Sequence, residues 1–216
     1  MDIDAIIFDL DGTLWDSCRV VSESWGETLR RLGCADWEPA PETIRGIMGM
    51  TAEEIAAALF SRYGERSREI CLRCIREENS YIARHGGDLY PGAGRTLAAL
   101  SEMLPLFIVS NCLEGYIECF LESSGFGPLF RDHVCEGETG LGKADNIALL
   151  IRRHGLRRPV YVGDTAVDER SARETGCDFI FASYGFGAAE RPDASIASLS
   201  ELPAVIDTLK GGFPRA

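Results

Sequence analysis

Short apolar segments alternate with amphipathic segments along most of the chain. Four continuous apolar runs end in small or polar residues, as the buried strands of a parallel sheet do. They span residues 5–8, 106–109, 160–162 and 179–181. Four other segments have the apolar spacing of helices and lead into turns. They span residues 94–102, 115–123, 143–154 and 167–174. This alternation predicts an α/β fold with a Rossmann-like, doubly wound parallel sheet.

Residues 16–88 follow a different pattern, with helical periodicity and no convincing strand. The helices expected there span residues 20–32, 41–47, 51–63 and 67–85. Thr51 and Glu54 have the spacing of a capping box. We therefore divide the chain into an α/β core, residues 1–15 and 89–216, and an all-helical cap, residues 16–88, inserted after the first strand. Because ligands bind at the carboxyl ends of strands in such sheets, we expect the cap to cover that site and to select the substrate.

The charge of the chain narrows the classes of partner. Its 216 residues include 22 Lys and Arg against 34 Asp and Glu, a net charge of −12, which disfavours binding to nucleic acids or anionic membranes. Only Lys143 and Lys210 are lysines. The eight cysteines are interpreted as thiols, and the acidic start of the chain does not resemble a secretory signal, so we expect a cytoplasmic protein. We interpret Cys71 and Cys74 as residues of a surface or half-buried helix.

Four acidic residues follow two of the expected strands. Asp9 and Asp11 come directly after the first apolar run, and Asp164 and Asp168 follow the run at 160–162. Parallel strands end at one edge of a sheet, so these carboxylates would repel one another unless a hard cation lay among them. Oxygen ligands of this kind suit Mg²⁺.

The same edge offers groups for binding and attacking a phosphate. Ser110 ends another strand, and Lys143 supplies a cation to an otherwise acidic chain. Asp9 is suited to act as a nucleophile because a carboxylate is already ionised, and Asp11 to give and take a proton. Gly12 allows backbone N–H groups to approach the phosphate. Each motif alone could be an ordinary turn or helix cap, and it is their joint occurrence that favours phosphoryl transfer.

Four motifs in this order resemble the haloacid dehalogenase superfamily, specifically its helical-cap phosphatases similar to phosphoglycolate phosphatase. They are Asp9-Leu10-Asp11-Gly12-Thr13-Leu14, Val109-Ser110-Asn111, Lys143, and Val162-Gly163-Asp164-Thr165-Ala166-Val167-Asp168. The resemblance covers essentially the whole chain. One local departure is Ala144, since a proline usually follows the lysine in these relatives.

The resemblance implies hydrolysis of small-molecule phosphomonoesters through an aspartyl-phosphate on Asp9, with Asp11 as general acid and base. It implies phosphate binding by four residues, namely Gly12, Ser110, Asn111 and Lys143. It also implies Mg²⁺ held by Asp9, the backbone carbonyl of Asp11 and Asp164, with Asp168 as a ligand through water or as a support. The expected partner is a small phosphorylated metabolite, and a monomer and a homodimer are both compatible with the sequence.

Related reactions are separated by single residues. Similar phosphonoacetaldehyde hydrolases use a cap lysine, which residues 16–88 lack, and haloacid dehalogenases lack the acid found here at Asp11. A sugar phosphomutase keeps the same residues and stays open as an alternative. The alternative of another class is a phospho-accepting signalling module. Such modules resemble a shorter chain whose accepting aspartate lies in the middle of the fold and which has no cap, so the position of Asp9 and the helical insertion disfavour this alternative.

Substrate specificity is expected to come from the cap and its hinge. Arg45 and Gly46 begin a glycine-interrupted loop, residues 45–50, in which Arg45 is a candidate for binding a substrate anion. The alternative is a plain loop with a surface arginine. Trp15 follows the first motif and either lines the leaving-group pocket or packs the hinge.

Overall fold

The computed structural model describes residues 2–48 and 50–210. Its contacts divide the chain into two compact units. The first contains the residues up to Asp16, then Leu89–Ile117 and the residues from Gly125 onward. The second contains Ser17–Asp88 and Glu118–Ser124. Residues 118–124, which the sequence-based division places in the core, pack on the long helix of the second unit, where the Cys119 thiol donates a hydrogen bond to the carbonyl of Asn79 at 3.3 Å.

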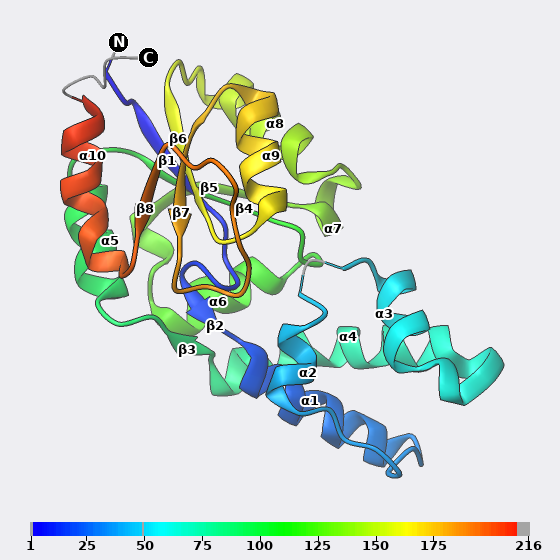
Figure 1. The fold of residues 1–216 in the computed structure, drawn as a ribbon. Coiled ribbons are helices and arrows are strands. Elements are labelled where there is room, and N and C mark those ends of the chain that lie inside the picture. The colour runs from blue at the N-terminus through cyan, green and yellow to red at the C-terminus, as the bar shows by residue number, and fades with distance from the viewer. Residues whose placement is uncertain (1, 49, 211–216) are drawn as a thin grey trace. The chain divides into compact units, whose positions relative to one another are not determined.

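The first unit is built on a six-stranded parallel sheet with the order β5-β4-β1-β6-β7-β8, which confirms the predicted fold class (Figure 1). Its strands are β1 (Ala5–Phe8), β4 (Leu106–Ser110), β5 (Phe130–Cys135), β6 (Pro159–Gly163), β7 (Asp178–Ala182) and β8 (Ala194–Ile196). In the central register Phe8 lies opposite Ile108 and Val162. The residues that follow these three therefore reach the same edge of the sheet.

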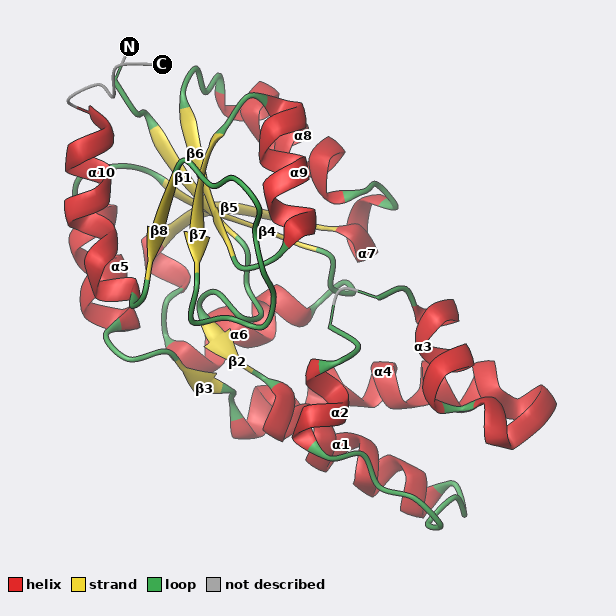
Figure 2. Ribbon diagram, in the orientation of Figure 1, coloured by secondary structure: helices red, strands yellow, loops and turns green. Residues whose placement is uncertain are grey.

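Helices cover both faces of this sheet (Figure 2). α8 (Lys143–His154) and α9 (Ala166–Thr175) pack on one face, and α5 (Ala93–Ser101) and α10 (Leu202–Lys210) lie on the other. Beneath α8 and α9, side chains from the strands and helices form a fully buried cluster. It includes Ile7, Phe107, Val109, Tyr161 and Phe179 from strands and Ile147, Leu150 and Ala172 from helices. Burial of each large apolar side chain stabilises the fold by about 1.5–3 kcal/mol, which keeps the strand ends in place.

The two edge strands were not predicted from the sequence. β5 and β8 lie at opposite edges of the sheet and expose part of their length. Arg131 in β5 and Ser195 in β8 are exposed, so neither strand forms the continuous apolar run that marks a central parallel strand. Two short elements beside them were also missed, α7 (Glu136–Thr139) and the helix α10. A second, two-stranded sheet pairs β2 (Trp15–Asp16) with β3 (Asp88–Leu89), at the ends of the segment expected to be entirely helical.

The second unit is helical, and its main contact is between α1 and α4. Its elements are α1 (Cys18–Arg31), α2 (Pro41–Arg45), α3 (Ala52–Leu59), a 3₁₀ helix (Ser61–Arg66) and α4 (Ser67–His85); part of α6 (Tyr116–Ser124) belongs to it too. The capping box of α3 is confirmed, because the Thr51 N–H donates to Glu54 Oε2 at 2.8 Å and the Glu54 N–H to Thr51 Oγ1 at 3.3 Å. The expected helix 51–63 is interrupted: α3 ends at Leu59, and Gly64 has a φ of 58°.

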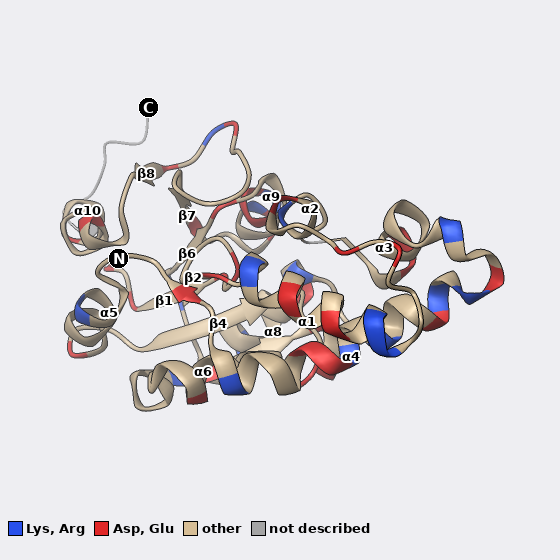
Figure 3. Cartoon of the chain, turned by 90° about the horizontal axis from the view of Figure 1, so that it is seen from below, with Lys and Arg blue, Asp and Glu red and all other residues tan. Residues whose placement is uncertain are grey.

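Acidic and basic residues are both present along α1 and α4 (Figure 3). Arg31 and Arg73 both pair with Glu77, at 3.3 and 3.0 Å. Such exposed ion pairs contribute less than about 1 kcal/mol each. Among residues 2–48 and 50–210, no helix combines the length and apolar character needed to cross a membrane.

All eight cysteines are free thiols. Cys71 and Cys74 lie on α4, which is half-buried as predicted, and both thiols are fully buried. Their side chains belong to the apolar face of α4 rather than to its charged face. Burial raises the pKa of Cys71 to about 11 and that of Cys74 to about 12, so both remain protonated thiols at neutral pH.

Candidate active site

Asp9 follows β1 directly and is held against the neighbouring strand. Its backbone N–H donates to the carbonyl of Val162 at 2.8 Å, which continues the parallel ladder past the end of β1. The chain then turns, with the N–H of Leu14 donating to the carbonyl of Leu10 at 2.9 Å. The side chain of Asp9 is almost entirely buried, with 5% of its surface exposed. A short strand and a tight turn thus place one carboxylate inside the protein at the carboxyl edge of the sheet.

Lys143 connects Asp9 to a second buried acid. Its Nζ donates to Asp9 Oδ1 at 2.9 Å and to Asp168 Oδ1 at 2.7 Å, and the lysine itself is buried. Lys143 is the first residue of α8, so it needs no following proline to reach this position. The two contacts come from three separate parts of the sequence, and they form the charged centre of the site.

Asp168 is fixed by hydrogen bonds to both of its carboxylate oxygens. Oδ1 accepts from Lys143 and from the Tyr161 hydroxyl at 3.3 Å. Oδ2 accepts from the backbone N–H of Thr165 at 2.9 Å and from the backbone N–H of Asp164 at 3.2 Å. The Asp168 side chain also forms the capping box of α9 with Thr165. These bonds suit Asp168 to holding Lys143 in place more than to direct contact with a cation.

Asp164 is completely buried and surrounded by glycines that leave it room. Its Oδ2 accepts from the backbone N–H of Phe186 at 2.7 Å, and Thr13 Oγ1 donates to its Oδ1 at 3.4 Å. A Cβ on Gly12 would lie 2.2 Å from Asp164 Oδ2, and one on Gly185 would lie 2.3 Å from its Cβ. Gly12 also has a φ of 85°, which side-chain-bearing residues rarely adopt. Glycine at these two positions is therefore required for Asp164 to occupy the site.

The buried charges shift one another's protonation. Burial raises the pKa of Asp9, and the nearby Asp168 and Asp164 carboxylates add to the rise that Lys143 opposes. Burial likewise raises the pKa of Asp164 to about 6, again with Asp168 contributing. For Lys143, burial acts to lower the pKa, but the Asp168 and Asp9 carboxylates outweigh it and raise the pKa instead. One lysine does not neutralise three buried acids when all are ionised.

This shortage of positive charge fits a divalent cation. Asp9, Asp164 and Asp168 each offer a carboxylate oxygen, and these atoms lie within 4.8 Å of one another. Oxygen donors of this kind match the preference of Mg²⁺. A cation there would offset the repulsion that raises the pKa values of Asp9 and Asp164. The donor set therefore agrees with the cofactor expected from the sequence.

Asp11 lies beside this cluster in different surroundings. It is partly exposed, and its Oδ1 accepts one hydrogen bond from Trp15 Nε1 at 3.0 Å and one from the Tyr116 hydroxyl at 2.8 Å. Both donors are neutral. The two aspartates of the first motif thus have different donors: the ammonium group of Lys143 binds Asp9, and two neutral donors bind Oδ1 of Asp11.

Ser110 and Asn111 reach the same edge of the sheet from β4. Ser110 is the last residue of that strand and is 4% exposed. The Asn111 Oδ1 atom is buried and has no hydrogen-bond partner within the described part of the chain. A buried amide oxygen without a partner is costly, and a hydrogen-bond donor or a cation can satisfy it, whereas a phosphate oxygen, itself an acceptor, cannot. Both residues lie at the edge of the sheet where the phosphate site is expected, and phosphate binding by them stays a prediction.

The specificity residues predicted from the sequence have different locations. Arg45 is exposed at the end of α2, and Gly46 follows it; both belong to the second unit, and Gly49 of the expected loop lies outside the described residues. Trp15 is in the first unit and buried, with 1% of its surface exposed. Its indole packs edge-on against the ring of Tyr116, with centroids 5.9 Å apart. Trp15 therefore packs inside the first unit, while the function of Arg45 and Gly46 stays a prediction.

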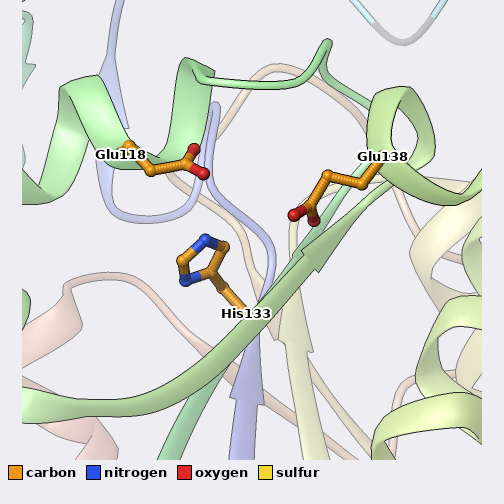
Figure 4. A group of neighbouring side chains, drawn as sticks. All are labelled: Glu118, His133 and Glu138. Carbon is orange, nitrogen blue, oxygen red and sulfur yellow. The ribbon is translucent and has the colours of Figure 1, made fainter.

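A second group of potential metal ligands includes His133 on β5 and Glu138 on α7 (Figure 4). Its third member, Glu118, belongs to the second unit. The Glu138 carboxylate already accepts from the backbone N–H of Cys135 at 3.2 Å, which caps α7. This carboxylate thus has a structural function, and we assign no metal to the group.

Three contributors to the site were missed by sequence reasoning. Tyr161 lies in a buried apolar run, yet its hydroxyl bonds to Asp168 and to the carbonyl of Val109 at 3.1 Å. The Tyr116 hydroxyl donates to Asp11, and the backbone N–H of Phe186 donates to Asp164. Tyrosine in a fully buried strand was the only available signal, because a buried hydroxyl needs a partner. A backbone N–H leaves no trace in the sequence.

Comparisons with known proteins agree with this geometry. A family model described as haloacid dehalogenase-like hydrolase matches residues 6–182. The phosphoglycolate phosphatases of Photobacterium profundum and Vibrio parahaemolyticus are 28% and 29% identical to the chain; each alignment covers 95% of this chain, and 95% and 96% of the relatives. A haloacid dehalogenase-like family hydrolase from Streptococcus pneumoniae has a similar structure, with a TM-score of 0.78 and 28% identity over 94% of this chain and 98% of that one.

Proposed function

The chain belongs to the haloacid dehalogenase-like hydrolase family, and from this membership we propose that it is a Mg²⁺-dependent phosphatase of small phosphomonoesters that forms an aspartyl-phosphate. The observation that carries the proposal is the buried contact of Lys143 with Asp9 and Asp168, beside Asp164 and Asp11. This arrangement combines a carboxylate nucleophile, a cation for the phosphate and a separate proton carrier. The hydrolysis of phosphoester bonds is supported further by relatives named phosphoglycolate phosphatase.

In the first half of the proposed reaction, a carboxylate oxygen of Asp9 attacks phosphorus. The new bond joins Asp9 to the phosphoryl group, and the bond between phosphorus and the ester oxygen breaks. Asp11 donates its proton to the departing oxygen, so the product leaves as an alcohol and Asp11 becomes a carboxylate.

In the second half, water replaces Asp9 on phosphorus. Asp11 accepts a proton from the water as its oxygen bonds to phosphorus, and the bond to Asp9 breaks. The products are inorganic phosphate, the ionised Asp9 and the protonated Asp11. The side chain that assists departure of the alcohol is thus restored for the next cycle.

The remaining residues hold the reacting groups. Lys143 orients Asp9 and, with Gly12, Ser110 and Asn111, binds the phosphate oxygens, while Asp168 holds Lys143. The carboxylates of Asp9 and Asp164 and the backbone carbonyl of Asp11 would hold Mg²⁺. When bound, Mg²⁺ offsets the repulsion between the Asp9 carboxylate and the phosphate dianion.

We propose a small phosphorylated metabolite as the substrate, and phosphoglycolate is the first candidate because of the relatives' names. The free thiols suit a reducing compartment, which supports a cytoplasmic location. Assembly as a monomer or a homodimer stays a prediction.

A panel of metabolite phosphates tests the proposal. The purified protein is mixed with phosphoglycolate, hexose phosphates and p-nitrophenyl phosphate, with Mg²⁺ or with EDTA, and released phosphate is measured. We expect release that requires Mg²⁺ and is lost in Asp9→Asn, which also controls for contaminating phosphatases. Isomerised hexose phosphates without phosphate release would indicate the phosphomutase instead. A phosphorylated protein that never turns over would indicate a signalling module.

A further inference from the structure

The carboxylate of Asp11 is held on one side by two aromatic donors. Trp15 Nε1 and the Tyr116 hydroxyl both donate to Oδ1, at 3.0 and 2.8 Å. Both donors are neutral groups that keep their protons at neutral pH. Two hydrogen bonds to Oδ1 therefore fix the direction of this oxygen.

Both donors are fixed by their own surroundings. Trp15 and Tyr116 are 1% and 3% exposed, and their rings meet at 78° with centroids 5.9 Å apart. The backbone carbonyl of Trp15 accepts from the N–H of Gly12 at 2.9 Å, which ties Trp15 to the turn that carries Asp11. Buried rings in contact rotate little without losing packing. The direction of the two hydrogen bonds is thus set by the core of the first unit.

The two donors lie close to the boundaries of the first unit in the sequence. Trp15 is four residues after Asp11, whereas Tyr116 is separated from it by 105 positions. Each lies within two residues of a point where the chain passes from the first unit to the second, after Asp16 and after Ile117. Trp15 and Tyr116 are nevertheless assigned to the same unit as Asp11, so their contacts with it are internal to that unit.

We propose that Trp15 and Tyr116 are positioning residues, which orient the Asp11 carboxylate so that Oδ2 transfers the proton in the phosphatase reaction. This inference rests on the proposed function. The two aromatic residues act through Asp11 and do not touch phosphorus. Their value lies in orientation, since a displacement of about 1 Å in a reacting group can slow a reaction about a hundredfold.

The leaving group makes this inference testable. An alkoxide leaves poorly without a proton, whereas p-nitrophenolate is a stable anion that leaves without one. A misoriented Asp11 therefore slows the transfer of phosphate from an alkyl ester more than from p-nitrophenyl phosphate. The ratio kcat/KM reports this first transfer, because phosphoryl transfer to Asp9 releases the alcohol.

The experiment compares Tyr116→Phe with the wild-type protein on phosphoglycolate and on p-nitrophenyl phosphate. The variant keeps the ring and removes only the donor. We expect kcat/KM for phosphoglycolate to fall about tenfold or more, and kcat/KM for p-nitrophenyl phosphate to fall less than about threefold. If phosphoglycolate is not a substrate, the best alkyl phosphate of the panel replaces it.

A matched control is available in the second unit. Tyr63 also donates a hydroxyl to a carboxylate, Asp36 Oδ1, at 3.0 Å, and Tyr63→Phe should leave both ratios unchanged. Trp15→Phe removes the other donor and should produce the same dependence on leaving group as Tyr116→Phe. Thermal unfolding curves are measured for each variant. They give the folded fraction at the assay temperature, to which the rates are normalised.

The outcomes separate this inference from the proposed function. Loss of phosphate release in Asp9→Asn together with leaving-group dependence in Tyr116→Phe supports both. Equal losses on the two substrates, or no loss, would overturn the positioning function while Asp9→Asn remains inactive. Activity that persists in Asp9→Asn would instead overturn the proposed reaction itself.

Discussion

Asp9 and Asp11 are two residues apart, yet they lie in opposite surroundings. Asp9 is 5% exposed and contacts the ammonium group of Lys143, whereas Asp11 is partly exposed and its Oδ1 accepts from two neutral donors, Trp15 and Tyr116. A cation beside a carboxylate favours its ionised form, and a neutral donor mainly fixes its direction. The difference shows how one short motif provides both a carboxylate nucleophile beside a cation and a separate residue that gives and takes a proton.

The same comparison explains how each surrounding is built. The groups around Asp9 come from β1, α8 and α9, where strand pairing and helix capping fix every partner. The groups around Asp11 come from aromatic residues at the edges of the first unit. The charged groups are thus concentrated at the carboxyl ends of the central strands, and the neutral hydrogen bonds to Asp11 lie close to the points where the chain leaves the unit.

The largest effect is expected from exchanging either carboxylate for an amide. Asp9→Asn should lower phosphate release from every substrate by about a thousandfold or more, because no aspartyl-phosphate forms. Asp11→Asn should still be phosphorylated by p-nitrophenyl phosphate, which gives a burst of p-nitrophenol followed by slow turnover. Stopped-flow absorbance measures both. Identical behaviour of the two variants would abolish the distinction between these residues.

Removal of the Lys143 ammonium group should have the next largest effect. Lys143→Met leaves the Asp9 and Asp168 carboxylates buried without a positive charge beside them. We expect the free energy of unfolding to fall by about 3–5 kcal/mol. Urea denaturation in EDTA measures it. Adding Asp168→Asn to the variant should recover part of the loss, because one uncompensated charge is removed. Unchanged stability of Lys143→Met would contradict the charged network around Asp9.

The glycine between these surroundings provides a sharper test. Gly12→Ala places a Cβ 2.2 Å from Asp164 Oδ2, at a φ of 85°. The matched control is Gly33→Ala, at a φ of 72° with no atom within 4 Å of the new Cβ. Both should lose about 1–3 kcal/mol of stability from backbone strain, and Gly12→Ala should lose more because its Cβ also overlaps Asp164. Only Gly12→Ala should also weaken the rise in thermal midpoint caused by Mg²⁺, so equal Mg²⁺ responses would place the cation away from Asp164.

The smallest effect concerns the second unit. Arg45→Ala should raise KM several-fold for a substrate with a second anionic group, such as phosphoglycolate, and leave p-nitrophenyl phosphate nearly unchanged. Arg66→Ala, another exposed arginine of this unit, is the control. Equal changes in KM for both substrates would remove Arg45 from substrate recognition.

The sequence was sufficient to predict the central strands and the acids at their ends. Buried runs such as residues 5–8 and 160–162 report parallel strands directly, so the positions of Asp9 and Asp164 followed from the pattern. β5 and β8 were hidden because edge strands mix polar and apolar residues. The donors to Asp11 were hidden for another reason: Tyr116 contacts Asp11 only through the tertiary fold, and nothing local to residue 116 indicates it.

The most direct measurement is the detection of phosphate on Asp9 during turnover. The Asp11→Asn variant is mixed with p-nitrophenyl phosphate and Mg²⁺, quenched in acid, and digested for peptide mass spectrometry. We expect one phosphoryl group on the peptide that carries Asp9, located on Asp9 by fragmentation and absent from Asp9→Asn. Phosphate found on another residue, or rapid release of phosphate and p-nitrophenol with no phosphorylated peptide, would contradict the division of function between Asp9 and Asp11.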